Sequence, residues 1–243
     1  STRGIYMGVW KLPTTWHVDN YVRVLEGTAG LARFMANSLG VISAATLLVI
    51  VLSTPLAYVL SKIEFPGSSS ISMFFIIGLG IPVQSIFIPL YLIMNRIQLT
   101  DSLIGLTWLY AVLSLPFTVY ILMGFFKTIP SSIEDSARID GASAWQSFRT
   151  IMIPLARSGI ISVAIYNFVM LWKEFLLALV FISGETKQTI SLGLYSMVTK
   201  MTYTGDWGGL FAGVVLVVMP SVIFYIIFAR QFVRGITMGI GKA

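Results

Sequence analysis

The chain has 243 residues, of which 56% are hydrophobic and only 11% are charged, and its net charge is +6. A soluble domain carries about 25% charged residues, so this composition excludes an ordinary water-soluble fold and indicates surface that faces lipid. The absence of cysteine excludes disulfides and cysteine metal or redox centres, and the single histidine, His17, excludes a histidine-cluster metal site. The dispersed positive charge is typical of the basic ends of a membrane protein, whereas a nucleic-acid binder gathers its Lys and Arg residues on one face.

Five apolar runs predict membrane-spanning helices. Each is longer than the ~20 residues that cross a hydrocarbon core of about 30 Å. Backbone groups in lipid need hydrogen-bond partners within the protein, and these runs lack the short alternation of barrel strands. The predicted fold is therefore all-α, a polytopic transmembrane helix bundle. The predicted spans are 34–61, 65–95, 102–126, 155–182 and 207–229.

Four prolines lie inside these runs, namely Pro55, Pro82, Pro89 and Pro116. Proline removes a backbone donor, so each predicts a kink or a broken turn, although membrane helices also tolerate proline without one.

The basic residues beside the spans predict their orientation. The positive-inside rule places the long polar loop 128–154 and the C-terminal tail in the cytoplasm. Segments 1–33 and 183–206 are then extracytoplasmic. Because 1–33 also carries basic residues and needs a preceding segment to take it across, we expect a sixth, N-terminal span in the native protein that this sequence lacks. The expected organisation is an extracytoplasmic segment 1–33 followed by a transmembrane domain 34–243.

The loop 128–154 opens with the signals of a short helix. Pro130 suits the first turn, and one of the two serines after it can cap the helix. Glu134 and Asp135 place negative charge near the positive end of the helix dipole. Gly141 is a natural stop.

A second short helix follows in the same loop. Ser143 and Gln146 have the spacing of a capping box, and Pro154 marks the entry into the next span. We therefore expect two short helices that meet at a bend on the membrane surface. Small residues at the bend would let another protein approach closely, and the loop is longer than the usual 2–8-residue connection of helix bundles. A docking surface and an amphipathic hairpin lying on lipid fit this spacing about equally.

The loop also resembles the signature loop of ABC importer permeases, which reads EAA, three residues, G, nine residues, I-x-L-P. The anchors in this chain are Asp135, Ser136, Ala137, Gly141, Ile151, Ile153 and Pro154. The departures are Asp for Glu at 135, Ser for Ala at 136 and Ile for Leu at 153, all conservative in size or charge.

Further motifs extend this resemblance over nearly the whole chain. The stretch A-R-I-D-G-A at 137–142 has the form seen in carbohydrate importers, and the chain is similar to the second permease of maltose-type heterodimeric sugar importers. The other matching motifs are N-S-L at 37–39, L-A-Y at 56–58, F-P-G at 65–67, I-P at 81–82, W-x-E-F at 172–175 and Q-F-V-R-G-I-T-x-G at 231–239.

The resemblance implies a permease with a six-helix core in the bacterial inner membrane. It implies a second permease as heterodimer partner, a dimer of ATP-binding subunits below, and an extracytoplasmic solute-binding protein that delivers the sugar. The chain contains no G-x-x-x-x-G-K-[ST] motif, so we expect no ATPase site and no cofactor of its own, with ATP bound by the partner subunits. The residues expected to couple to the ATPase are Glu134, Asp135, Ser136, Ala137, Arg138, Asp140, Gly141, Ala142, Ile151 and Pro154.

Lys173 and Glu174 interrupt the predicted span 155–182. Ionisable groups inside a membrane cost about 2.5–3.5 kcal/mol on insertion scales, so they usually face a cavity or a partner. Neighbours on a helix point about 100° apart, so we expect these two not to neutralise each other. Permeases that this chain resembles commonly carry Asn in place of Lys173, and a cation there favours an acidic substrate such as a uronate or alginate-type oligosaccharide. Alternatively, Lys173 pairs with the partner permease or reaches the interface, and the substrate is a neutral sugar or polyol.

The predicted pathway residues are Lys173, Glu174, Gln84 and Asn167. Gln84 follows Pro82, where a broken turn would expose backbone groups. Polar residues in membrane helices more often join helices to one another, which is the competing interpretation for Gln84 and Asn167. A self-sufficient secondary transporter would need charges in several spans, and a membrane enzyme would need a catalytic set at depth. Only one span here carries charged residues, which counts against a secondary transporter, and no catalytic set is visible.

Overall fold

The computed structural model describes residues 18–26 and 30–240, and within these ranges the side chains of all but 201–202 and 229–240. Residues 1–17 of the predicted N-terminal segment lie outside this description. Every regular element in the described part is helical, which confirms the all-α prediction. The elements are α2 (Asp19–Glu26), α3 (Leu31–Lys62), α4 (Ser68–Leu79), η1 (Val83–Ile86), α5 (Phe87–Arg96), α6 (Leu103–Thr128), α7 (Ser131–Ile139), α8 (Ala144–Ser147), the π-helical turn η2 (Phe148–Met152), α9 (Ile153–Trp172), α10 (Leu176–Phe181), η3 (Glu185–Lys187), α11 (Ile190–Thr204) and α12 (Trp207–Ile240).

Four described helical stretches are long and apolar enough to cross a membrane. They are α3, α6, the continuous stretch Ala144–Trp172 that ends with α9, and Trp207–Phe228 of α12. The predicted spans 34–61, 102–126 and 207–229 are thereby confirmed. A long run without charged residues is a sufficient signal for these helices, because lipid requires apolar side chains and internal backbone hydrogen bonds along the whole segment.

The predicted span 65–95 is not one straight helix. It consists of α4 and a second half, Val83–Arg96, which meet at an angle of 98°. The helix stops after Leu79, and Pro82, which has no N–H to donate, leads into η1. The broken turn expected at Pro82 is therefore present, whereas Pro55 and Pro116 lie inside the uninterrupted helices α3 and α6.

A span is present in this region, but its predicted bounds, 155–182, are wrong. Helix α9 ends at Trp172, and the short helix α10 begins at Leu176. The carbonyl of Trp172 accepts a hydrogen bond from the Ser191 hydroxyl at 3.1 Å, so a side chain of α11 satisfies the end of α9. Most of 183–206, which the sequence indicated only as an extracytoplasmic connection, forms α11.

Helices α3 and α6 pack against each other at the centre of the bundle, and α9 packs against both. Helix α12 covers α9 and also contacts α11 and α2. Gly159 lets α9 approach α6 closely, because a Cβ at this position would lie 2.4 Å from the ring of Phe125. Two hydrophobic clusters fill the interior, one around Tyr110 and one around Phe126.

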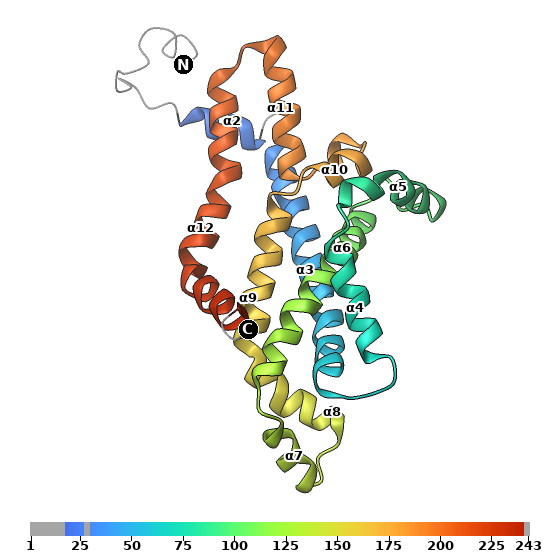
Figure 1. The fold of residues 1–243 in the computed structure, drawn as a ribbon. Helices are drawn as coiled ribbons and strands as arrows, with labels where there is room; N and C mark the ends of the chain where they lie inside the picture. Colours follow the sequence, from blue (N-terminus) through green and yellow to red (C-terminus); the bar gives the residue numbers. More distant parts are fainter. Residues whose placement is uncertain (1–17, 27–29, 241–243) are drawn as a thin grey trace.

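The loops lie at opposite ends of this bundle. Helices α7 and α8 form one end, and α2, α10 and α11 lie toward the other (Figure 1). This arrangement agrees with the predicted placement of 128–154 and 183–206 on opposite sides of the membrane. We refer to the two ends as the cytoplasmic and extracytoplasmic ends.

Asp101 joins two loops at the extracytoplasmic end. Its carboxylate accepts hydrogen bonds from the Lys187 ammonium at 2.7 Å, from the Gly184 N–H at 2.8 Å and from the Ser183 N–H at 3.0 Å. The Lys187 hydrogen bond and, after it, the Gly184 N–H hold the pKa of Asp101 below its ordinary value. The α5–α6 loop and the α10–α11 loop are thereby fastened together.

Candidate functional site

The cytoplasmic loop has the bent two-helix shape that its sequence predicts. Helix α7 ends at Ile139, and Gly141 adopts a positive φ of 84° that turns the chain. The capping box at the start of α8 is complete. The Ser143 hydroxyl accepts from the Gln146 N–H at 3.3 Å, and the Gln146 side chain accepts from the Ser143 N–H at 2.8 Å.

The expected serine cap at the start of α7 is wrong. Pro130 occupies the N-cap position with extended backbone, no side-chain cap is present, and Ser131 is already helical. Pro130 therefore sets the entry angle of the chain.

The loop presents most, but not all, of its predicted coupling residues to solvent. Asp135, Ser136, Arg138, Asp140, Gly141 and Pro154 are exposed, Ala142 and Ile151 are half-buried, and Glu134 and Ala137 are buried. Two large apolar side chains also stand out from this polar surface, since Ile139 is 86% exposed and Trp145 is 62% exposed. We call the exposed part of α7, the bend and α8 the loop surface.

Glu134 points into the protein rather than to the loop surface. It is 4% exposed, and its carboxylate accepts a hydrogen bond from the hydroxyl of Tyr58 on α3 at 2.6 Å. The exposed guanidinium of Arg138, one turn along α7, lies 3.3 Å from the same oxygen. Sequence reasoning missed Tyr58 as a partner, although a tyrosine inside an apolar span, in the L-A-Y stretch at 56–58, was a signal for an internal polar contact.

Glu174 also makes internal contacts. Its carboxylate accepts from the hydroxyl of Tyr110 on α6 at 2.6 Å and from the N–H groups of Leu177 and Ala178 at 2.7 and 3.2 Å. Glu174 thus caps α10 and explains why a new helix starts after α9. Lys173 and Glu174 form no ion pair, as expected, but the reason is not the 100° between helical neighbours, because the helix has ended before Lys173.

Lys173 is exposed at this break. The four ion pairs of the described residues all join other side chains. Lys173 therefore has no carboxylate partner in the described part of the chain. Helix α9 has 20 residues and is therefore about 30 Å long, which puts Lys173 near the extracytoplasmic end.

The predicted pathway residues do not form one cluster. Asn167 is buried, and its amide donates to the hydroxyl of Thr118 on α6 at 2.9 Å, so it joins α9 to α6 as the competing interpretation expected. Gln84 is exposed in η1 beside the Pro82 break. Asn167 and Glu174 therefore face inward, while Lys173 and Gln84 remain accessible.

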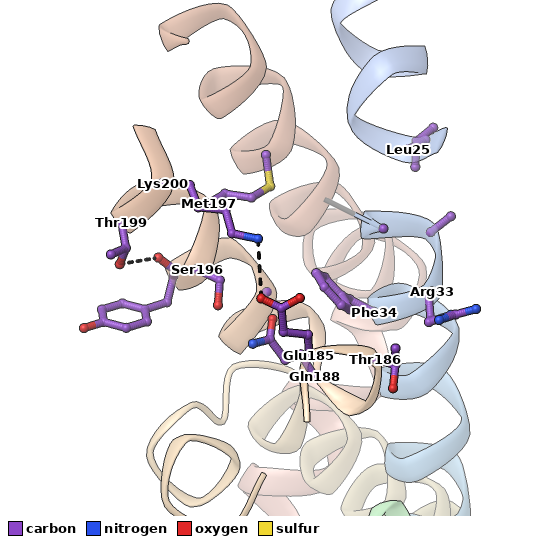
Figure 2. Close-up of a pocket in the computed structure, with 14 residues that line it drawn as sticks. Leu25, Arg33, Phe34, Glu185, Thr186, Gln188, Ser196, Met197, Thr199 and Lys200 are labelled. Atoms are coloured by element: carbon purple, nitrogen blue, oxygen red, sulfur yellow. Dashed lines mark hydrogen bonds and ion pairs between the residues drawn. The ribbon is translucent and has the colours of Figure 1, made fainter. Parts of the chain in front are cut away.

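A cavity of about 690 Å³ lies at the extracytoplasmic end, between the start of α3, the turn at 185–188 and α11. Figure 2 shows Glu185 facing Lys200 across it, and these two side chains form an ion pair at 3.8 Å. The volume of this cavity is in the range of small-molecule sites. None of the predicted pathway residues lines it. Among the described residues there is no group of three or more His, Cys, Asp or Glu side chains that could hold a metal.

Comparisons with known proteins agree with these features. Residues 49–238 match the family model described as binding-protein-dependent transport system inner membrane component. The chain is 34% identical over 239 residues to the diacetylchitobiose uptake system permease protein NgcG of Streptomyces coelicolor, covering 98% of this chain and 79% of that protein. It is 31% identical to the trehalose transport system permease protein SugB of Mycobacterium tuberculosis, covering 95% of this chain and 84% of that protein.

A solved structure has the same fold. A chain of a bacterial ABC transporter involved in the import of the acidic polysaccharide alginate superimposes with a TM-score of 0.84 at 21% identity, covering 95% of this chain and 85% of that chain. At this identity the likeness establishes the architecture alone. The family match and the two sugar-permease relatives go further: the chain belongs to the binding-protein-dependent transport system inner membrane components and is a sugar ABC importer permease that crosses the inner membrane several times.

Proposed function

We propose that this chain pairs with a second permease and a dimer of ATPase subunits to import an acidic oligosaccharide of the uronate type. In this proposal residues 34–243 form the permease domain, residues 1–33 lie on the extracytoplasmic side, and a solute-binding protein delivers the substrate there. The chain contributes no ATPase site.

The loop surface supports docking of a partner. Ile139 and Trp145 expose large apolar side chains on an otherwise polar loop, and aromatic and aliphatic groups of this kind are typical anchors at protein interfaces. Arg138 and Asp140 are exposed beside them and provide charges for a polar rim. The capped bend holds these groups on a rigid support.

Docking can be tested by copurifying the ATPase subunit with the permease pair. Ile139→Asp places a charge in the proposed contact, so we expect it to abolish copurification, whereas Ile139→Leu keeps an exposed apolar side chain at this position and should retain it. Gly141→Val forces a β-branched residue into a positive φ and should weaken copurification, while Gly141→Asn, which tolerates this conformation, should retain it. Unchanged copurification of both Ile139→Asp and Gly141→Val would rule out docking at this surface.

Lys173 is the observation that carries the proposed substrate class. Its ammonium is accessible, and the neighbouring carboxylate of Glu174 is fully engaged with Tyr110 and the start of α10. A cation near the extracytoplasmic end of a span that has no carboxylate partner in the described part of the chain is suited to attract and contact an anionic sugar. The import of an acidic polysaccharide by a transporter that contains this fold is consistent with the proposal.

A neutral oligosaccharide is the second candidate, and the relatives favour it. Diacetylchitobiose and trehalose, which appear in the names of the two relatives, carry no net charge. In that case Lys173 would contact the partner permease or lipid headgroups.

Uptake into proteoliposomes that contain the whole transporter and its binding protein separates these candidates. The probes are a uronate trisaccharide and a neutral trisaccharide. For the acidic candidate we expect uronate uptake to fall tenfold or more in Lys173→Asn, which corresponds to about 1.4 kcal/mol, and to be retained in Lys173→Arg. Uptake should be unchanged in the control Lys200→Asn, which removes another exposed extracytoplasmic lysine. Uptake of only the neutral sugar, unaffected by Lys173→Asn, would establish the second candidate instead.

A further inference from the structure

Tyr58 connects four elements at the cytoplasmic end of the bundle. It lies on α3, is 3% exposed, and bonds through its hydroxyl to Glu134 on α7. Its ring packs edge-on against Phe126 of α6, with ring centroids 5.8 Å apart. It also packs at a tilt against Phe148 of the π-turn η2, with ring centroids 5.0 Å apart. One side chain therefore contacts α6, α7 and the start of the helical stretch that leads into α9.

The Tyr58–Glu134 contact is costly to break. A buried carboxylate is stable only while it is hydrogen-bonded or paired. Glu134 has two such partners, the Tyr58 hydroxyl and the guanidinium of Arg138. Because Arg138 is on α7 itself, the Tyr58 bond is the one contact among the described residues that ties the Glu134 carboxylate to the membrane helices. Movement of α7 away from α3 would remove this donor and leave the carboxylate with a single, half-exposed partner.

The loop has three routes into the bundle, and the first is the backbone that joins α6 to α7 through Ile129 and Pro130. Helix α8 continues through η2 into α9 without interruption, so displacement of the loop reaches α9 through the backbone. Single π-turns within helices are frequent at functional sites. The third route leads to α3, through the Tyr58 hydroxyl and through the Lys62 ammonium, which donates to the carbonyl of Ile129 just before α7. Helix α3 is separated from the loop in the sequence by α4, α5 and α6, so this direct route depends on side chains.

We propose that Tyr58 is a positioning residue for energy coupling: its hydrogen bond to Glu134 holds α7 against α3, so that a displacement of the loop surface moves α3 together with α9. The inference rests on the proposed docking of an ATPase at the loop surface. Without the bond the ATPase still docks and still hydrolyses ATP, but α3 follows the loop poorly and fewer sugar molecules are transported per ATP.

The test is Tyr58→Phe in the whole transporter, reconstituted with its partner permease, ATPase and binding protein. This change keeps the ring packing and removes only the hydroxyl. We expect normal copurification of the ATPase and a fall of about fivefold or more in sugar transported per ATP, the lower end of usual allosteric couplings. The matched control is Ser38→Ala, which removes a buried hydrogen bond of 2.7 Å from the Ile190 N–H at the other end of the same helix and should leave the transport ratio unchanged.

A double variant separates coupling from loss of stability. Tyr58→Phe leaves a buried carboxylate short of one partner, and adding Glu134→Leu removes that carboxylate. If the bond transmits motion, Tyr58→Phe/Glu134→Leu stays uncoupled even where its thermal stability recovers. Glu134→Gln keeps an oxygen that accepts from Tyr58 and should retain most of the coupling.

Three results would overturn the inference. They are a wild-type transport ratio in Tyr58→Phe, recovery of the ratio in the double variant, and loss of ATPase copurification in Tyr58→Phe, which would mean that the bond only shapes the loop surface. Failure of the wild-type permease to copurify with the ATPase is a different result, because it would reject the proposed docking itself and the coupling role with it.

Discussion

The hydroxyl of Tyr110 lies 2.6 Å from the carboxylate of Glu174, and this hydrogen bond joins α6 to the break between α9 and α10. Tyr110 is about two turns, or roughly 10 Å, inside α6, so the carboxylate is held below the extracytoplasmic end of the bundle. Two N–H groups at the start of α10 bind the same carboxylate. The adjacent residues Lys173 and Glu174 therefore have different roles, one accessible and one internal.

Glu174→Ala should destabilise the protein far more than Lys173→Ala. The first change leaves the Tyr110 hydroxyl and the N–H groups of Leu177 and Ala178 without their acceptor, at a cost of about 1–3 kcal/mol. The second alters an exposed side chain and should stay within about 0.5 kcal/mol. Thermal unfolding of the purified permease in detergent measures both, and equal shifts would contradict the capping role of Glu174.

Asn167→Leu should reduce stability modestly without changing the apparent KM for sugar uptake. Its amide bonds to Thr118, and hydrogen bonds between membrane helices average about 0.6 kcal/mol. Thr118→Val alone should have a similar effect, and the double variant should cost less than the sum because no polar group is left unpaired. A changed KM in Asn167→Leu would instead return this residue to the transport pathway.

Gly159→Ala should destabilise the contact between α9 and α6. The new methyl group would lie 2.4 Å from the Phe125 ring, and overpacking of this kind costs about 1–3 kcal/mol. Gly124→Ala is the matched control on α6, because a Cβ there meets no atom within 4 Å and alanine favours the helix. Combining Gly159→Ala with Phe125→Leu should recover part of the loss. A Gly159→Ala protein as stable as the control would show that the helices can separate freely.

The contribution of Asp101 to stability should depend on pH. Its pKa is lowered by the Lys187 ammonium and by the N–H groups of Gly184 and Ser183, so folding favours the charged form. The stabilisation is complete above the unfolded-state pKa of about 4 and is lost as the pH falls through that value toward the lower pKa of the folded state.

Asp101→Asn tests this dependence and tolerates the positive φ of 50° at this position. The wild-type protein should have the higher Tm at pH 7, and the difference should narrow toward pH 3 and in high salt, which screens this partly exposed pair. A difference in Tm that is constant with pH would exclude the carboxylate charge as its cause.

The local features of this protein followed from its sequence. Charge-free length predicted α3, α6 and α12, because every residue of a span meets the same requirement for apolar side chains and internal backbone bonds. The bend at Gly141 and the capping box at Ser143 were also predictable, because their hydrogen bonds form within one turn. The break at Pro82 belongs to this group, since proline acts on its own backbone.

Only the tertiary structure decided which polar side chains face inward. Glu134, Asn167 and Glu174 looked available for coupling or for substrate, yet each bonds to a residue on another helix, respectively 76, 49 and 64 positions away. The end of α9 at Trp172 has the same origin, since Ser191 and Glu174 satisfy the freed backbone groups. Local sequence does not encode these partners, because a buried polar group is stable only where the packing of several helices brings it a donor or an acceptor.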